Sequence, residues 1–478
     1  MKRSACALAV LLAGCSVGPD WQQPKVETPP AWRIDYAQAA ELANAKWWEA
    51  FGDPVLNQLI EQSLRENRDL LQAAARVDQF LGALRTTRSQ FYPQFGYSGD
   101  ASRNRASENG PTPLPAGVDR NYSLYEAALG AQWQIDLFGR VRRQAEAAQA
   151  QVYATEQGRR GVVLSVVASV TTGYIALRGL DRQLEIARAT EANYARSLDL
   201  FERRHKGGQV SELERSQVES QYRQAQAAVP SFERQVAQQE NLLAVLLGRN
   251  PGDIPRGKPI QELLDPAVPP GLPSTLLERR PDVLQAEQNL RAANAAIGVA
   301  KSLYYPTLSL TGLLGLSSVS LSNFAKSSSG TALLAAGVAG PLFTFGGIEG
   351  QVNSAEAGQR AALAFYQQTV FNAFRDTNDA LVGVAKRRAE YEALAKRATA
   401  LRTYARLSRA RYEGGAANYI EVLYAENELF AAELSAVSTL AERHAELINL
   451  YKALGGGWID GADPLAPKPQ EALPAPSR

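Results

Sequence analysis

The sequence predicts an α+β membrane protein that is internally duplicated, with four strands per protomer and very long helices. Three observations support this fold class. The N-terminus reads as a lipoprotein signal, two distant segments share one sequence frame, and alternating strand-like stretches interrupt helical sequence. The 51 basic and 49 acidic residues leave a formal net charge of +2, so no strongly basic surface indicates nucleic acid and no strongly acidic one indicates a cation store.

The first 14 residues have the layout of a secretory signal. Two cations precede an apolar run from Ala5 to Ala13, which is too short to span a bilayer as a helix. The sequence LAGC at 12–15 matches a bacterial lipobox, so we expect lipidation of Cys15, although an ordinary signal peptide that happens to contain cysteine is the alternative. Cys15 would be the only cysteine of the mature chain, which excludes a disulfide framework. Ser16 lacks the acidic character of an inner-membrane retention signal, so the sequence predicts the outer membrane.

The chain contains two copies of one unit. Residues 67–93 and 280–306 align over 27 positions and share Leu-Gln-Ala and a final Tyr-Pro. Farther along, each copy has a Gly-Gly pair followed, forty residues later, by another glycine. We therefore divide the chain into a signal peptide (1–14), a lipid-anchored extension (15–52), a first repeat (53–249), a Pro-rich linker (250–279), a second repeat (280–457) and a C-terminal tail expected to be mobile (458–478).

The helices are long and carry a coiled-coil seam. Apolar residues recur every seven positions over 166–201, and they step by alternating threes and fours over 420–451. A helix over 140–206 would be on the order of 100 Å long. Pro230 lies inside the second helix of the first repeat, where it removes a backbone donor, so we expect a kink or break there.

The strand-like stretches alternate apolar and polar side chains over residues 91–104, 125–136, 307–317 and, less clearly, 333–345. Each lasts about ten residues or slightly more, the length that crosses a bilayer when tilted. A hairpin packed on a soluble core would alternate in the same way, but the lipoprotein signal and the lack of an uninterrupted apolar helix favour the membrane. The predicted membrane-facing residues of the strands are Phe95, Tyr97, Leu129, Trp133, Leu308 and Leu310.

Four strands cannot close a barrel, because about eight is the smallest number observed. Open edges cannot face lipid either, since each unpaired backbone group costs several kcal/mol there. The chain must therefore oligomerise: two copies give eight strands around a filled interior, and three give twelve with room for a channel. The same symmetry would gather the helices into a hollow cylinder, so the sequence predicts a conduit.

Several motifs in order along the chain carry a resemblance to a known family. They include KWWEAFGDPVLNQLI (46–60), WQIDLFGRVRRQ (133–144) and RARYEGGAANYIEVLYAENEL (409–429). With the lipobox, the chain resembles the TolC-type outer-membrane factor lipoproteins, the NodT/OprM-like group, of tripartite efflux systems of the resistance-nodulation-division type. The resemblance covers nearly the whole mature chain.

The resemblance implies a homotrimer with a twelve-stranded outer-membrane barrel that continues into a periplasmic helical barrel. It implies passive conduction of drugs or other small amphiphiles, with a periplasmic adaptor and an inner-membrane transporter as partners, no catalysis and no cofactor besides the diacylglycerol and N-acyl chain at Cys15. The sequence has no phosphate loop, nucleophile elbow or zinc-protease motif. A type I protein-secretion outlet shares the architecture and is the alternative function, and a lipid-anchored scaffold without a pore is another.

The resemblance also implies a constriction at the periplasmic helix tips. The positions carried over are Tyr412, Glu421 and Glu214, where carboxylates ringed by symmetry would favour cations; alternatively, the two glutamates only stabilise the first turns of helices. Adaptor-contact turns are expected at Gly207, Gly208, Gly414 and Gly415.

Two positions depart from the family pattern. Ala417 and Tyr424 stand where some members carry Arg and a second Asp, so a closed-state ion-pair network is expected to be absent or different. The two histidines, His205 and His444, have no second ligand at metal spacing and are expected to be turn or seam residues. The sequence therefore predicts no metal site.

Overall fold

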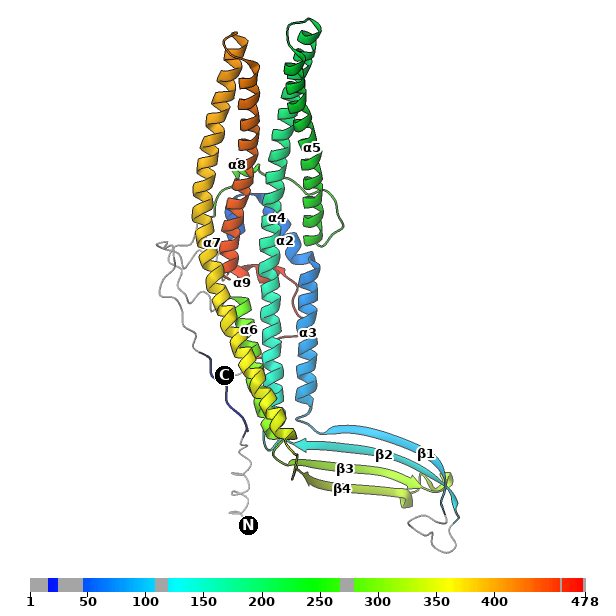
Figure 1. Ribbon diagram of the computed structural model, residues 1–478. Coiled ribbons are helices and arrows are strands. Elements are labelled where there is room, and N and C mark those ends of the chain that lie inside the picture. The colour runs from blue at the N-terminus through cyan, green and yellow to red at the C-terminus, as the bar shows by residue number, and fades with distance from the viewer. Residues whose placement is uncertain (1–15, 25–45, 108–118, 267–278, 456–457, 476–478) are drawn as a thin grey trace.

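The structure is a computed structural model that describes residues 16–24, 46–107, 119–266, 279–455 and 458–475. The predicted signal peptide and Cys15 lie outside the described residues. A long helical bundle carries the sheet at one end, and the sheet projects sideways from it (Figure 1).

The two halves of the chain repeat one order of elements. The first half consists of η2 (Trp47–Phe51), α2 (Pro54–Glu66), α3 (Arg68–Ser89), β1 (Gln94–Arg105), β2 (Asn121–Ile135), α4 (Arg140–Lys206) and α5 (Glu212–Leu246). The second half consists of α6 (Pro281–Ser302), β3 (Thr307–Ser318), β4 (Gly330–Ala339), α7 (Gly347–Glu413) and α8 (Tyr419–Ala453), followed by α9 (Trp458–Ala462) and η7 (Asp463–Leu465). Helices α4 and α7 each have 67 residues, and α5 and α8 each have 35, so the duplication extends to element length.

Proline and glycine set the junctions between helices and strands. Helix α3 ends at Ser89 and β1 begins directly after Pro93, and Pro306 holds the same place before β3. Proline cannot continue a helix and restricts the residue before it to extended backbone. On the return from the sheet, Gly139 (φ 79°) and Gly346 (φ 83°) cap α4 and α7 in the left-handed region, where glycine adds no steric cost.

The strands form one antiparallel sheet in the order β1-β2-β3-β4, and its outer strands β1 and β4 have no further partner among the described residues. The register places Tyr97 opposite Leu129, and Trp133 opposite Leu310. All six strand residues predicted from the alternation share one face of the sheet, because paired residues point to the same side.

The prediction of a fourth strand over 333–345 is wrong at both ends. Strand β4 runs from Gly330 to Ala339. Gly340 and Pro341 follow it, and Pro341 has no backbone N–H for a ladder. The strand begins earlier than predicted because pairing with β3 continues to Gly330, opposite Leu316.

The largest core joins the two ends of the chain. Trp47 stacks on Tyr451 with 5.2 Å between ring centroids, and Trp458 packs edge-on against Trp47 and Trp48. All four rings are buried, and each buried aromatic side chain contributes a large apolar area. The first and last helices are thereby fixed around the middle of α4.

A buried carboxylate organises this core. Asp53, which is fully buried, accepts hydrogen bonds from the Tyr174 hydroxyl at 2.8 Å and from the backbone N–H groups of Val55 at 2.9 Å and Lys258 at 3.0 Å. Burial, with the Asp53 carboxylate beside it, raises the pKa of Tyr174 above its ordinary value. The Asp53 carboxylate connects the start of α2, α4 and the linker between the repeats.

Over its described residues, 458–475, the C-terminal tail is packed rather than mobile, so that prediction is wrong there. Arg159, which is buried, pairs with Glu156 at 2.7 Å and with Asp463 at the start of the tail. Farther along, Asp78 accepts a hydrogen bond of 2.8 Å from the backbone of Gln470. The Pro/Ala-rich composition suggested mobility, but these polar groups of α3 and α4 hold the segment along the bundle.

Of the kink or break predicted at Pro230, the break is wrong, because α5 is continuous from Glu212 to Leu246. Pro230 is exposed, while Ala225 and Leu243 on either side are buried. Both buried residues belong to clusters that α5 shares with α4. Among the described residues, α4 alone is long and apolar enough to cross a membrane, but most of its apolar stretch is buried in the bundle.

Candidate functional site

The helical hairpins end in two equivalent turns. Gly208 (φ 68°) and Gly415 (φ 72°) adopt the left-handed conformation directly after α4 and α7. In each turn the residue after the second glycine donates a backbone hydrogen bond to an arginine carbonyl, from Gln209 to Arg204 at 2.9 Å and from Ala416 to Arg411 at 2.8 Å. This glycine-dependent end exposes a compact turn at the tip of each hairpin.

Tyr412 lies between the two hairpins. Its hydroxyl accepts a hydrogen bond of 2.8 Å from Arg204 on α4, and its ring lies 4.8 Å edge-on from that of Tyr419 and 6.4 Å from that of Phe201. The neighbouring core of Tyr419, Phe201 and Val422 is buried. Tyr412 therefore connects the hairpin of the first repeat to that of the second.

Glu421 is on α8 in the first turn. Its carboxylate pairs with Arg411 on α7 at 3.1 Å and lies 3.4 Å from the Ser408 hydroxyl. One turn farther, Arg409 of α7 pairs with Glu426 of α8. The tip of this hairpin thus contains ion pairs even though Ala417 and Tyr424 replace two charged residues of the family pattern.

Glu214 has a different environment. Its carboxylate accepts hydrogen bonds from the Ser211 backbone N–H at 2.8 Å and hydroxyl at 2.9 Å, and its own N–H donates to that hydroxyl, which forms a capping box. The backbone hydrogen bond and then the hydroxyl lower the pKa of Glu214. These contacts fit the helix-capping interpretation of Glu214.

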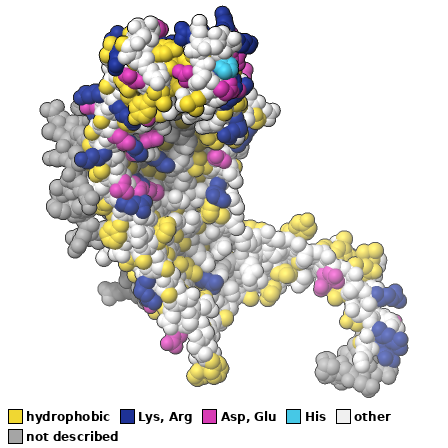
Figure 2. Space-filling view, turned by 45° about the horizontal axis from the view of Figure 1, so that its top comes forward, with side chains coloured by type: hydrophobic (Ala, Val, Ile, Leu, Met, Phe, Trp, Pro, Cys, Tyr) yellow, Lys and Arg dark blue, Asp and Glu magenta, His cyan; other side chains and the backbone are white. Residues whose placement is uncertain are grey.

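Sequence reasoning missed the arginines at the tips. Arg204, Arg409 and Arg411 supply the partners of Tyr412, Glu426 and Glu421. Their spacing before the glycine turns in RRHKGG and RARYEGG was the available signal. Figure 2 shows acidic and basic side chains mixed over the tips and the helices, while apolar side chains are frequent on the projecting sheet.

Further ion pairs join α7 to α8 along the second hairpin, away from its tip. Arg397 pairs with Glu428 at 2.7 Å, and Arg402 with Glu433 at 2.5 Å, each from α7 to α8. All four side chains are partly exposed, so each pair contributes at most about 1 kcal/mol. These pairs instead help to fix the register of α7 against α8.

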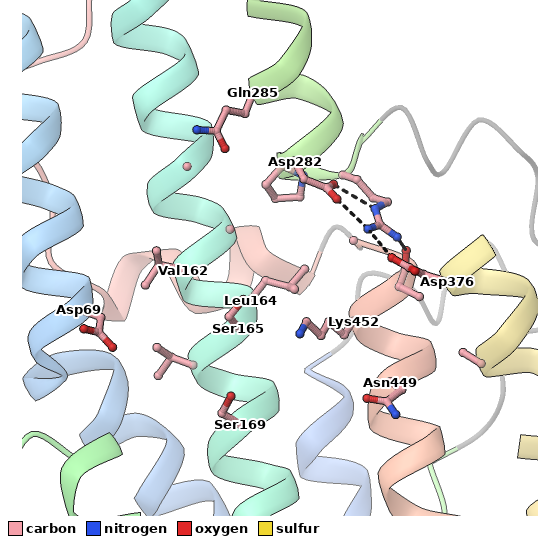
Figure 3. Close-up of a pocket in the computed structure, with 18 of the residues that line it drawn as sticks. Asp69, Val162, Leu164, Ser165, Ser169, Asp282, Gln285, Asp376, Asn449 and Lys452 are labelled. Atoms are coloured by element: carbon pink, nitrogen blue, oxygen red, sulfur yellow. Dashed lines mark hydrogen bonds and ion pairs between the residues drawn. The ribbon is translucent and has the colours of Figure 1, made fainter. Parts of the chain in front are cut away.

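A cavity of about 1070 Å³ lies between α3, α4, α6, α7 and α8 (Figure 3). Arg280 at its wall pairs with Asp282 at 2.7 Å and Asp376 at 3.4 Å, and donates to the Ala453 carbonyl at 2.8 Å. Burial opposes the charge of Arg280, but these carboxylates raise its pKa. Among the described residues no group of three or more His, Cys, Asp or Glu side chains is placed to hold a metal ion.

The geometry defines the subunit of a membrane channel. The sheet has one largely apolar face, and its two edges have no partner among the described residues. It joins helical hairpins whose long arms have 67 residues and whose tips carry glycine turns and charged side chains. Only repetition by symmetry would arrange those charges in rings. Such a subunit is incomplete alone, because its sheet cannot close.

Comparisons with known proteins agree with this class. The family model for outer membrane efflux proteins matches residues 59–249 and 272–456. The chain is 34% identical over 460 residues to the solvent efflux pump outer membrane protein SrpC of Pseudomonas putida, covering 94% of this chain and 97% of that protein. It is 32% identical to the outer membrane protein OprJ of Pseudomonas aeruginosa, covering 96% of each. The open-state MtrE outer membrane channel of Neisseria gonorrhoeae superposes with a TM-score of 0.83 at 29% identity, covering 93% of this chain and 99% of that one.

The chain belongs to the outer membrane efflux protein family. It is the outer-membrane channel component of an efflux pump, with its strands in the outer membrane and its helices in the periplasm.

Proposed function

We propose that three copies of this chain close a twelve-stranded barrel and a continuous helical tunnel, which conducts small amphiphiles passively to the exterior. The observation that carries the proposal is the sheet, whose outer strands β1 and β4 have no further partner in the part of the chain that the structure describes. Three copies give twelve strands, enough for an open interior. The energy for transport comes from an inner-membrane transporter, and this chain supplies the path.

Lipidation of Cys15 belongs to the same proposal. Ser16, the next residue, lies against Gly139 at the start of α4, where a Cβ added to the glycine would come within 3.0 Å of the Ser16 Cα. Val17 donates a backbone hydrogen bond of 3.2 Å to the Phe138 carbonyl at the same junction. The segment after Cys15 thus lies where β2 meets α4, which supports the proposal that acyl chains on Cys15 enter the inner leaflet near this junction.

The tip residues form the proposed constriction. Tyr412 and Glu421 come from the second hairpin, and threefold symmetry would repeat each around one axis, so that carboxylates favour cations until the tips separate. Glu214 would add its charge to this ring while its oxygens remain in the capping box. Gly207, Gly208, Gly414 and Gly415 would then present backbone turns to a periplasmic adaptor.

The substrate class follows from the relatives. Relatives named as solvent, toluene and antibiotic efflux pump outer membrane proteins share about a third of their residues with this chain over nearly its whole length. Small amphiphiles of this kind are therefore the proposed cargo rather than secreted proteins. The chain has one methionine and two histidines, so it offers few ligands for direct handling of metal ions.

Two measurements test the proposal. Outer-membrane fractions should contain a heat-modifiable trimer that conducts in planar bilayers, and monomers without conductance would contradict the channel. A deletion strain should become sensitive to solvents and amphiphilic antibiotics, with complementation by the intact gene as control. Normal tolerance together with a lost secreted protein would favour the type I secretion outlet.

A further inference from the structure

The seam between the two repeats is fully formed inside one chain. Strand β2 of the first repeat pairs with β3 of the second, from Tyr125 opposite Ser318 to Ile135 opposite Leu308. Just beyond the ladder, Phe138 stacks on Tyr305 with 4.7 Å between centroids and 22° between planes. The seam therefore has two parts, a strand ladder and an aromatic stack at its periplasmic end.

The equivalent seam at the other side of each repeat is open. Phe345 precedes the capping Gly346 as Phe138 precedes Gly139, and Tyr92 precedes Pro93 as Tyr305 precedes Pro306. Phe345 is 101% exposed and Tyr92 is 69% exposed. Both halves of a second stack are thus present in one chain, at opposite edges of the sheet.

Phe345 also has a strained backbone. Its φ of 48° is the one positive value among the described residues other than glycine. A bulky residue in this region is strained and persists where its surroundings fix it. Within the chain its side chain is fully exposed, so a contact outside the chain is the natural source of that constraint.

The β1–β2 and β3–β4 hairpins have the same strand register. The pairing that β4 and β1 would make across a subunit boundary can therefore be given residue by residue. The first pair of the β1–β2 hairpin is Gln94 opposite Gln132, and that of the β3–β4 hairpin is Thr307 opposite Ala339. Each hairpin begins directly after its Tyr-Pro pair. Equivalent positions of the repeats therefore superpose residue for residue, and the β2–β3 ladder can be transferred to β4 and a neighbouring β1.

We propose that the seam between subunits copies the seam within the chain, with a second copy of this chain as the partner. In this register Ala339 lies opposite Ser98 of the partner subunit, and Phe345 stacks on Tyr92 of the partner subunit. The equivalent internal pair is Gln132 opposite Thr311. Pro341 has no N–H to donate, so the ladder ends beside it. This inference rests on the proposed trimer and adds its register and its aromatic contact.

Disulfide cross-linking tests the register. The variant Ala339→Cys with Ser98→Cys, oxidised in outer-membrane fractions, should give dimers and trimers that survive boiling without reductant. Ala339→Cys with Gly96→Cys or with Asp100→Cys are the matched controls, because a slip of two residues moves the Cα atoms by about 7 Å, beyond disulfide reach. Each single cysteine variant shows whether the introduced cysteine forms a disulfide with Cys15 instead.

The outcomes separate this inference from the proposed function. Cross-links in the Ala339/Ser98 pair alone support the register. Cross-links in a slipped pair within a normal trimer overturn the register and leave the trimer standing. The lack of any trimer on native gels overturns the proposed function as well.

A second measurement tests the stack. Phe345→Ala and Tyr92→Ala should each shift trimer dissociation to lower temperature, and the double variant should shift it no further than the larger single change. Phe343→Ala is the control, since Phe343 is also exposed but has no aromatic counterpart in this scheme. Additive shifts of Phe345→Ala and Tyr92→Ala would overturn the stack.

Discussion

Arg411 on α7 and Glu421 on α8 form a 3.1 Å ion pair across the tip of the second hairpin. The arginine side chain is 58% exposed and that of the glutamate 29%, so the pair lies in a wet environment. Its loss should change stability by no more than about 1 kcal/mol. A large effect of Glu421 on conduction would then support the proposed role of its charge in the pore.

We expect Glu421→Gln to reduce the cation preference of the channel in planar bilayers while the trimer remains intact. Glu428→Gln is the control, because Glu428 pairs with Arg397 on the same two helices farther from the tip. Selectivity that is the same in both variants would favour the alternative in which Glu421 only stabilises the start of α8.

The Asp53 network should be essential for folding. Asp53→Ala leaves the donors of Tyr174, Val55 and Lys258 without their acceptor, and we expect a loss of about 3–5 kcal/mol in unfolding free energy. Tyr174→Phe removes one of these contacts and should cost about 1–3 kcal/mol. Denaturation of the purified protein measures both. Tyr404→Phe, at an exposed position, should have little effect.

The buried Arg159 should hold the C-terminal tail. Arg159→Met leaves Glu156 without its cation and leaves Asp463 with Lys468 as its remaining partner, so it should destabilise the tail by about 3–5 kcal/mol. We expect rapid proteolysis after residue 458 in this variant. Arg160→Met is the matched control, because its partner Asp460 is 73% exposed. Equal protease resistance in the two variants would contradict a holding role for Arg159.

His444 should make stability depend on pH. Burial, and then the charge of Arg443, lower its pKa to about 4, even though the Asp265 carboxylate lies 3.3 Å from Nδ1. The unfolded chain binds a proton near pH 6.5, so this stability is present above that pH and is lost as the pH falls toward 4, by up to about 3 kcal/mol. Thermal unfolding at pH 7 and pH 4.5 should show a larger drop for the wild type than for His444→Leu. Equal drops would mean that His444 is charged in the folded state.

The two faces of the sheet should respond differently to charge. Leu310→Arg places a cation on the face shared with Leu129 and Trp133, and should cost about 2–4 kcal/mol if the residue lies at mid-bilayer. Ser309→Arg, on the opposite face, is the control. Heat-modifiable trimer in outer-membrane fractions measures assembly. Equal assembly of both variants would show that the faces are misassigned.

Much of the fold could be predicted because it depends on local patterns. The heptad seam and the glycine turn predicted the helix over Arg140–Lys206, and Tyr-Pro marked the junctions with β1 and β3. These signals act over a few residues, through backbone sterics and side-chain periodicity.

The parts that could not be predicted depend on long-range contacts. The packing of Asp463 on Arg159 joins residues about 300 positions apart, and composition alone suggested a mobile tail. The continuity of α5 through Pro230 depends on packing against α4, and the early start of β4 depends on its partner β3. At the tips, the pairing of Glu421 with Arg411 required the geometry of the hairpin.

The aromatic core that joins Trp47 and Trp48 to Trp458 has a consequence for biogenesis. Its members lie at opposite ends of the chain, so this core is a contact of very high sequence separation. A chain that emerges N-terminus first into the periplasm cannot complete it until the last helix has been translocated. We therefore expect the nascent subunit to need a holding chaperone throughout export, and its competence for assembly to be decided only when secretion ends.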